Sequence, residues 1–353
     1  MLQSLVVGEQ NYDVNTLTHS LRFVRIHRRQ MSDRMAEGNR GPRGRVIVVS
    51  ATAAGRPAPL VSSLGYVGVT AVDLGAWEQF GTRVLGLEIA ESGPDRLLLR
   101  ADERAFRVSV TPGDGSCDFI GWEVADAAAL GEVVAALGRI GVETSRDPVL
   151  AKERSVADLV RAVDPAGTNL EFFYGQETSA TPFKSPTSAT FVTGELGLGH
   201  AVLVVPDMEE AERFYLETLG FLESDRVRTP RFDVLFTHCN PRHHSLAMMP
   251  TKTGLEAGLH HFMIEVDDLD TVGHALDKVL DGAAQLNSSI GKHINDLMVS
   301  FYCQTPSKCE VEYGVGGITI DDATWVPSVH TIENVWGHRR LPGAPPDGMP
   351  AGM

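Results

Sequence analysis

The chain has 353 residues, of which 43% are hydrophobic and 22% charged, and its formal net charge is −15. This length is enough for two domains, and the composition is that of a globular protein. The negative charge argues against nucleic acid or an anionic membrane as a partner, and no apolar run reaches the roughly 18 residues of a membrane-spanning helix. The four cysteines form no CxxC pair, which indicates a reducing, cytoplasmic compartment.

The first 57 residues form a basic extension. Residues 1–57 hold nine Arg against four Asp and Glu, with a Gly- and Arg-rich stretch from 38 to 45. No hydrophobic period runs through the segment, so we expect it to be mostly disordered. A basic tether is one hypothesis for its role. The simpler hypothesis, which we favour, is that it has no function or is an upstream extension, with Met31 and Met35 as internal start candidates.

Beyond residue 57 the chain repeats itself. Residues 64–89 align without gaps on residues 198–223, and residues 118–137 align on residues 260–279. The first pair reads as a strand, an Asp turn or helix cap, an amphipathic helix and a Leu-Gly stop. The repeat therefore predicts four modules, each made of a strand, a helix and further strands.

The four modules divide into two domains. We predict an N-terminal domain over residues 58–178 and a C-terminal domain over residues 193–340, joined by a Ser-, Thr- and Pro-rich linker at 176–192. The Pro-, Gly- and Met-rich residues 341–353 are expected to form a flexible tail.

Two histidines and one carboxylate stand at matching places in the second half, each on a separate predicted strand. Superposing the halves puts His200 on Tyr66, His261 on Phe119 and Glu312 on Glu171. If the histidines served only for packing, there would be little reason for one half to gather a complete ligand set. A set of two imidazoles and one carboxylate suits non-haem Fe(II) and leaves coordination positions open. The sequence therefore predicts one metal site, in the C-terminal domain.

Strand alternation supports the choice of ligand within the His-His pair. His260 and Phe262 fall on the apolar face that is expected to pack on helices, whereas His261 falls on the opposite face. His200 and Val202 share a face in the same way. All three ligands can thus point into one cavity.

Six motifs give the chain its resemblance to a known family. They are GLGH (197–200), HCNPRHHSLA (238–247), LHHFMIEV (259–266), GKHINDLMVSFY (291–302), EVEYG (310–314) and WGH (336–338). With them, residues 60–340 resemble the type I extradiol ring-cleavage dioxygenases of the vicinal-oxygen-chelate superfamily, the group of 2,3-dihydroxybiphenyl 1,2-dioxygenase. The resemblance implies an α+β fold of two domains, each with two βαβββ modules forming a cup-like mixed sheet, and a metal only in the C-terminal domain. It also leads us to expect a homo-oligomer.

The resemblance implies a role for each residue of the site. His200, His261 and Glu312 would bind Fe(II), and His244 would act as the acid and base. His293 and Tyr302 would hydrogen-bond the catecholic oxygens, with Asn295 and Asp296 beside them and Phe236 and Val202 lining the ring pocket. His238 and His243 are interpreted as structural or pocket-edge residues, and His338 as a support for a loop or an interface. The short connection 226–235 borders the pocket, so the size of the substrate stays open.

The activity implied by the resemblance is Fe(II)-dependent extradiol cleavage of a catechol, with insertion of both atoms of O₂. A bicyclic or polycyclic substrate such as a 2,3-dihydroxybiphenyl-like diol is expected, and Mn(II) is the alternative metal. Two other functions stay in view: another metalloenzyme of this fold, such as an α-keto-acid dioxygenase or a glyoxalase-like enzyme, and a non-catalytic binding protein. The intact ligand set and His244 argue against a binding protein, which needs neither open metal positions nor a proton carrier.

Overall fold

The structure is a computed structural model that describes residues 47–48, 58–230, 233–251 and 255–344. Apart from Ile47–Val48, the predicted extension at 1–57 lies outside the described residues, as does the tail beyond residue 344. Among the described residues, no helix is long and apolar enough to span a membrane.

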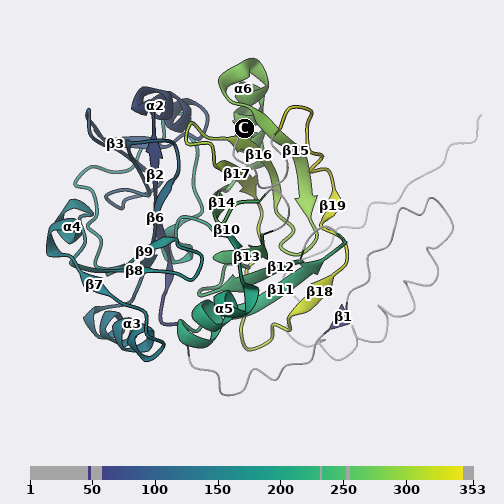
Figure 1. Cartoon of the computed structure of the whole chain (residues 1–353). Coiled ribbons are helices and arrows are strands. Elements are labelled where there is room, and N and C mark those ends of the chain that lie inside the picture. Colours follow the sequence, from purple (N-terminus) through teal and green to yellow (C-terminus); the bar gives the residue numbers. More distant parts are fainter. Residues whose placement is uncertain (1–46, 49–57, 231–232, 252–254, 345–353) are drawn as a thin grey trace, which may run out of the picture. The chain divides into compact units, whose positions relative to one another are not determined.

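The N-terminal half forms an eight-stranded mixed sheet in the order β3-β4-β5-β2-β6-β9-β8-β7 (Figure 1). Its helices are α2 (Leu74–Arg83), α3 (Ala127–Arg139) and α4 (Pro148–Glu153). Its strands are β2 (Ser63–Ala71), β3 (Glu88–Ser92), β4 (Leu97–Arg100), β5 (Val108–Pro112), β6 (Cys117–Glu123), β7 (Ser145–Arg146), β8 (Asp158–Val163) and β9 (Asn169–Tyr174).

The C-terminal half forms an eleven-stranded mixed sheet in the order β1-β18-β11-β12-β13-β10-β14-β17-β16-β15-β19. The helical segments are η1 (Gly194–Leu196), α5 (Met208–Glu212), α6 (Leu269–Lys278) and the π-helical continuations η2 (Arg213–Thr218) and η3 (Val279–Ala283). The strands are β1 (Ile47–Val48), β10 (Ala201–Val205), β11 (Leu222–Arg228), β12 (Asp233–His238), β13 (Leu246–Pro250), β14 (Gly258–Val266), β15 (Leu286–His293), β16 (Val299–Gln304), β17 (Glu310–Val315), β18 (Ser328–His330) and β19 (Asn334–Trp336). With four βαβββ modules along the chain, the predicted α+β fold is confirmed.

Aspartates begin the first helix of each module, as the repeat predicts. Asp73, Asp126, Asp207 and Asp268 each accept hydrogen bonds from backbone N–H groups of the first helical turn. An N-cap of this kind satisfies donors that have no partner within the helix. The same local signal therefore starts the helix in all four modules.

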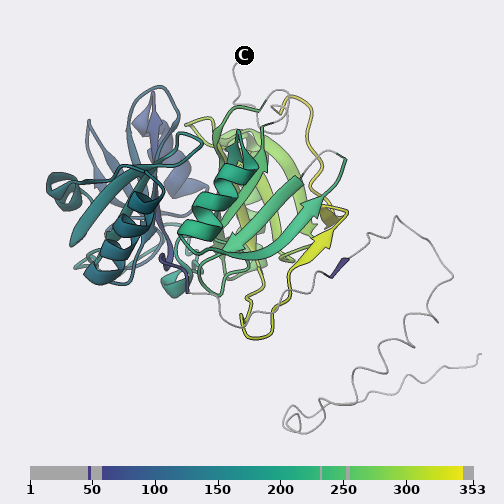
Figure 2. The same ribbon diagram turned by 60° about the horizontal axis from the view of Figure 1, so that its bottom comes forward.

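The two faces of the second sheet have different tasks. Ala201 and Leu203 of β10 share one buried cluster with Phe214 of η2 and Val272 of α6, so the helices cover this face (Figure 2). Val202 and Val204 instead join a separate cluster on the opposite face. The alternation along β10 thus leaves one face of the sheet free to build a site.

The register of the strands repeats from one half to the other. Gly68 of β2 lies opposite Phe119 of β6, and Val202 of β10 lies opposite His261 of β14. Both pairings contain a bulge at the next step, which leaves His260 unpaired in β14. The alternation predicted that His260 lies on the apolar face with Phe262. This prediction is wrong, because a bulge redirects the side chain.

Strand β1 is the one part of the basic extension that the structure describes. Ile47 and Val48 pair antiparallel with Val329 and Ser328 of β18. We expect deletion of residues 1–57 to leave activity and the melting temperature nearly unchanged, because a two-residue pairing contributes only a few hydrogen bonds of about 1 kcal/mol each. Thermal melts and turnover of the truncated protein test this. Failure of the truncated chain to fold or assemble would show that the extension is structural.

Candidate metal centre and substrate cavity

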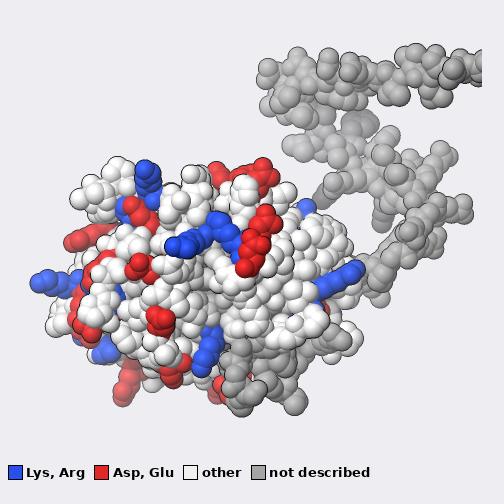
Figure 3. Space-filling view, turned by 90° about the horizontal axis from the view of Figure 1, so that it is seen from above, with Lys and Arg blue, Asp and Glu red and all other residues white. Residues whose placement is uncertain are grey.

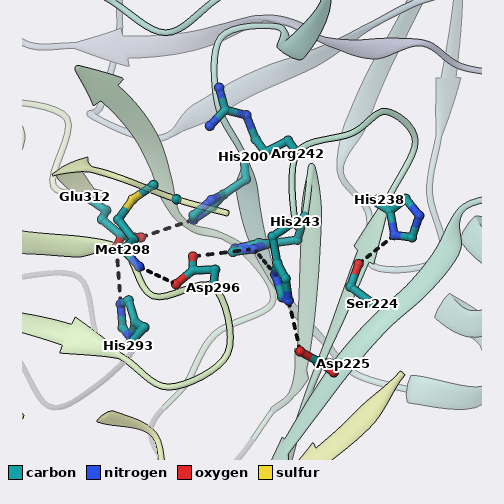
Figure 4. Close-up of polar contacts among 12 residues, drawn as sticks. His200, Ser224, Asp225, His238, Arg242, His243, His293, Asp296, Met298 and Glu312 are labelled. Atoms are coloured by element: carbon teal, nitrogen blue, oxygen red, sulfur yellow. Dashed lines mark hydrogen bonds and ion pairs between the residues drawn. The ribbon is translucent and has the colours of Figure 1, made fainter. Parts of the chain in front are cut away.

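Three buried side chains of the C-terminal sheet converge on one point. His200 directly precedes β10, His261 lies on β14 and Glu312 on the adjacent β17. Nε2 of His200 is 3.2 Å from Oε2 of Glu312, and Nε2 of His261 is 3.6 Å from the same oxygen. The sequence-predicted ligand set is therefore brought together from three segments of one sheet, and Figure 4 shows the contact between His200 and Glu312.

These three residues fit a divalent metal ion. One ligand atom from each lies within 4.8 Å of the others. Protein ligand atoms lie about 2.1 Å from such a metal, so two of them at right angles are about 3.0 Å apart. The distances from His200 and His261 to Oε2 of Glu312, 3.2 and 3.6 Å, are close to this value. Nδ1 of His261 is 2.7 Å from Nδ1 of His260, which leaves Nε2 of His261 free for a metal. The residues could thus supply a two-histidine, one-carboxylate site.

Burial and mutual contact set the charges of these ligands. Burial lowers the pKa of His200, which favours the neutral imidazole that binds metals. Burial alone would raise the pKa of Glu312, but hydrogen bonds from His200, His261 and His293 hold it well below its usual value. The site therefore offers neutral nitrogen and anionic oxygen.

Two contacts that the sequence did not reveal orient Glu312. The hydroxyl of Ser300, on the neighbouring β16, donates to Oε1 of Glu312 at 2.6 Å. Ser300 also meets Nε2 of His338, whose Nδ1 is 2.8 Å from Oδ1 of Asn334. Partners of this kind orient metal ligands. The alternation of β16, with Ser300 and Tyr302 on one face, was the signal that could have pointed to Ser300.

His244, His293 and Tyr302 surround the three candidate ligands. The ring centroid of His244 lies 3.9 Å from that of His200. His293 Nε2 is 2.8 Å from the Tyr302 hydroxyl and 3.2 Å from Oε1 of Glu312. Burial lowers the pKa of His293, but its contacts with Glu312 outweigh this and raise the pKa to about 9. The structure thus places all three sequence-predicted residues at the site.

A cavity of about 400 Å³ opens beside these groups. Val202 and Phe236 line its apolar wall, and Asn295 and Asp296 line its polar end. Nδ2 of Asn295 is buried and has no hydrogen-bond partner among the described residues, so a polar ligand could satisfy it. His338, interpreted from the sequence as a loop support, holds Asn334 and also lines the cavity.

The equivalent place in the N-terminal sheet is filled by an ion pair. Tyr66 donates to Oε2 of Glu171 at 2.7 Å, and Arg154 reaches both oxygens of Glu171, with its NH2 2.9 Å from Oε1. The Arg154 guanidinium lies 3.9 Å from the ring centroid of Phe119. Arg154 thus supplies the positive charge that a metal ion could supply at the equivalent point in the C-terminal sheet.

Glu171 and Glu312 provide a matched pair of variants. We expect Glu171→Gln to lower the free energy of unfolding by about 3 kcal/mol, because it leaves buried Arg154 without its counter-charge, and to leave the metal content unchanged. Glu312→Gln should instead lower the metal content. Urea unfolding and metal analysis of both variants test this. Loss of metal in Glu171→Gln would show that the N-terminal sheet takes part in metal binding.

Two other polar groups of the described residues resemble sites. Ser224 Oγ lies 2.7 Å from Nδ1 of His238, whose Nε2 lies 2.8 Å from Asp322. This row has the order of a hydrolase triad, but Ser224 is fully buried and cannot reach a substrate. The row instead joins β11 and β12 to the loop before β18. The second group is His243, His244 and Asp296, which has the spacing of a metal site. It adjoins the candidate metal ligands, because the rings of His244 and His200 are in contact.

Comparison with known proteins identifies similar sequences over most of the chain. Residues 197–313 match the Glyoxalase/Bleomycin resistance protein/Dioxygenase superfamily, and residues 64–113 match the family described as Dihydroxybiphenyl dioxygenase BphC D1. The chain is 42% identical over 290 residues to a biphenyl-2,3-diol 1,2-dioxygenase of Metapseudomonas furukawaii, across 80% of this chain and 94% of that protein. It is 39% identical to an iron-dependent extradiol dioxygenase of Rhodococcus jostii (strain RHA1), across 79% and 97% of the two chains.

A solved structure shows the same arrangement of elements. The crystal structure of a halotolerant catechol dioxygenase superposes with a TM-score of 0.77 at 37% sequence identity, and the match covers 82% of this chain and 98% of that one. A match of this length is longer than either half of the fold alone, so it includes parts of both halves.

Proposed function

The chain belongs to the type I extradiol dioxygenases of the glyoxalase and dioxygenase superfamily, and from that membership we propose that it cleaves the ring of a catechol beside its two hydroxyls. The observation that carries this proposal is the convergence of His200, His261 and Glu312 at one end of the 400 Å³ cavity. The bound metal would be Fe(II) and the co-substrate O₂. His200, His261 and Glu312 would hold the metal, which would supply the chemistry of lowering the pKa of a catecholic hydroxyl and bringing the reactants together.

The remaining residues of the cavity have separate tasks in this reaction. His244 is buried, and this burial lowers its pKa well below the usual value. The nearby His200 lowers the pKa further, so a neutral ring is available to accept a proton. The pair His293 and Tyr302 would hydrogen-bond the catecholic oxygens, and Asn295 and Asp296 would complete the polar end. Val202 and Phe236 would hold the apolar ring.

The apolar wall favours a bicyclic substrate. Val202, Phe236 and Met249 form one apolar patch in the lining of the cavity, and this patch offers no charged partner to a second ring. We therefore propose a 2,3-dihydroxybiphenyl-like diol as the substrate class, in agreement with the substrate named for the Metapseudomonas furukawaii relative.

Basic and acidic side chains are interspersed on the face drawn in Figure 3, so the described surface seen there offers no continuous basic area for a polyanion. The four unpaired cysteines support a reducing, cytoplasmic location.

One experiment tests the activity and the substrate class together. After anaerobic reconstitution with Fe(II), oxygen uptake is measured across a panel of monocyclic and bicyclic catechols, and the product is followed in the visible range. We expect the highest kcat/KM with the bicyclic diols and a yellow product whose spectrum shifts with pH as its enol ionises. A colourless dicarboxylic acid would mean cleavage between the hydroxyls and would contradict the proposal.

Iron should be required in its divalent form. We expect peroxide-treated protein to lose activity while it keeps its iron, and ascorbate with Fe(II) to restore the activity. Two neutral imidazoles and one carboxylate leave divalent iron with a single net positive charge, which suits electron donation to O₂. Iron content and turnover are measured before and after each treatment, with untreated protein carried in parallel. Full activity of the ferric protein, or full activity with Mn(II) alone, would contradict the Fe(II) assignment.

A further inference from the structure

A row of three buried side chains leads from β11 to the substrate cavity. Nε2 of His243 lies 3.0 Å from Oδ2 of Asp225 (Figure 4), and Nδ1 of His243 lies 3.1 Å from Nδ1 of His244. The two rings are nearly perpendicular, with an interplanar angle of 88°. Asp225 is on β11, whereas the two histidines lie between β12 and β13. The sequence interpretation of His243 as a structural or pocket-edge residue therefore omits its contact with His244.

Asp225 can only accept hydrogen bonds. Its burial would raise its pKa, but hydrogen bonds from His243, His330 and Ser328 lower the pKa to about 2. Oδ1 accepts from both the backbone N–H and the hydroxyl of Ser328, each at 2.7 Å. The side chain is thus a carboxylate, and the nitrogen of His243 that faces it must carry a proton.

The proton on Nε2 of His243 determines what its other nitrogen does. In a neutral imidazole with Nε2 protonated, Nδ1 is an acceptor. Its partner, Nδ1 of His244, must then be the donor. Asp296 acts in the same direction, since its Oδ2 lies 3.8 Å from the same nitrogen of His244, too far for a hydrogen bond but close enough for charge attraction. Both neighbours therefore favour a proton on Nδ1 of His244.

We propose that Asp225 and His243 are positioning residues that set the tautomer of His244, with the proton on Nδ1 and the lone pair on Nε2. This inference rests on the proposed dioxygenase function. The lone pair on Nε2 takes the proton of a catecholic hydroxyl: the O–H bond breaks, an N–H bond forms on His244, and no electron is lost or gained. The resulting imidazolium still donates from Nδ1 to His243, and the carboxylates of Asp225 and Asp296 stabilise its charge.

Asp225→Asn tests the tautomer with little change of shape. The amide oxygen can still accept from Ser328, but the amide nitrogen would donate to His243. His243 would then be protonated on Nδ1 and would donate to His244, whose own proton would move to Nε2. A carboxylate-to-amide change of this kind lowers kcat by about 10⁴-fold in a serine protease triad. For Asp225→Asn we expect a loss of kcat of at least about 100-fold, with iron content, catechol KM and melting temperature close to wild type.

Two variants of His243 separate hydrogen bonding from packing. The oxygen and nitrogen of a glutamine amide can accept from His244 and donate to Asp225, so His243→Gln should stay within about tenfold of the wild-type kcat. His243→Phe keeps the ring but makes neither hydrogen bond, and should lose at least about 100-fold. Equal activity of the two variants would overturn the proposal, because packing alone would then explain the role of His243.

The tautomers themselves can be read by nitrogen-15 NMR of histidine-labelled, full-length protein. The protein is loaded with Zn(II), a diamagnetic ion that accepts imidazole and carboxylate ligands. We expect His244 to be protonated only on Nδ1 and His243 only on Nε2, and both to reverse in Asp225→Asn. A proton on Nε2 of wild-type His244, or on both nitrogens of His243, would overturn the proposal. So would a second metal ion bound through His243, His244 and Asp296.

The spectra do not depend on turnover. If wild-type protein cleaved no catechol, the proposed function would fail while the tautomers could still be assigned. If the wild type were active and Asp225→Asn reversed the tautomers without lowering kcat, only the role given to Asp225 and His243 would be overturned.

Discussion

His261→Ala is expected to abolish metal binding and turnover together. It removes one of three ligands that converge within 4.8 Å, and two remaining protein ligands hold a divalent ion poorly. We expect less than about a tenth of the wild-type iron after desalting and no measurable oxygen uptake with catechols. Metal analysis of the wild type should give one iron per chain, because the N-terminal sheet holds Arg154 at the equivalent place.

The matched control for this variant is His274→Ala. His274 is exposed on α6 and belongs to neither group of potential metal ligands in the described residues. We expect this variant to keep its iron and its activity. Full iron retention in His261→Ala, or two iron ions per wild-type chain, would show that the metal is held elsewhere.

His244→Phe should lose turnover while it keeps metal and substrate. His244 lies beside His200 but is not among the three convergent ligands, so its loss leaves the metal set intact. A general acid or base typically contributes about 10²- to 10⁴-fold to the rate. We therefore expect kcat to fall by at least about 100-fold, with wild-type iron content and nearly wild-type anaerobic catechol binding.

His244→Ala serves as the companion variant. His244→Ala leaves a space that the phenylalanine of His244→Phe fills. Equal losses of kcat in the two variants would therefore come from the missing imidazole and not from a change in packing. Either variant with kcat within about threefold of wild type would mean that His244 takes no part in proton transfer, and the tautomer argument would fall with it.

Much of the fold could be predicted from local patterns. The helix starts at Asp73, Asp126, Asp207 and Asp268 need only a capping side chain before an amphipathic run, and that signal is contained in a few consecutive residues. The equivalence of Tyr66 with His200 follows from the alignment of the halves, and the register of the two sheets agrees with it. The alternation of β10 likewise separated Val202 from Leu203 correctly.

Local patterns did not reveal the bulge in β14. Alternation placed His260 with Phe262, yet the register shift leaves His260 unpaired and brings its Nδ1 to within 2.7 Å of His261. A bulge depends on how two strands pair, and no residue within the strand itself marks it.

The sequence by itself determined which residue types are present for metal chemistry and, outside the bulge in β14, which strand face each position occupies, because a period of two is a property of a single strand. Only the tertiary structure decided which distant groups meet. Ser300 reaches Glu312 across β16 and β17, Arg154 balances Glu171 where a metal could have stood, and Asp225 meets His243 across a hairpin. These contacts join residues up to 18 positions apart, and the alternation within a single strand does not specify which side chains of other strands and loops will meet it.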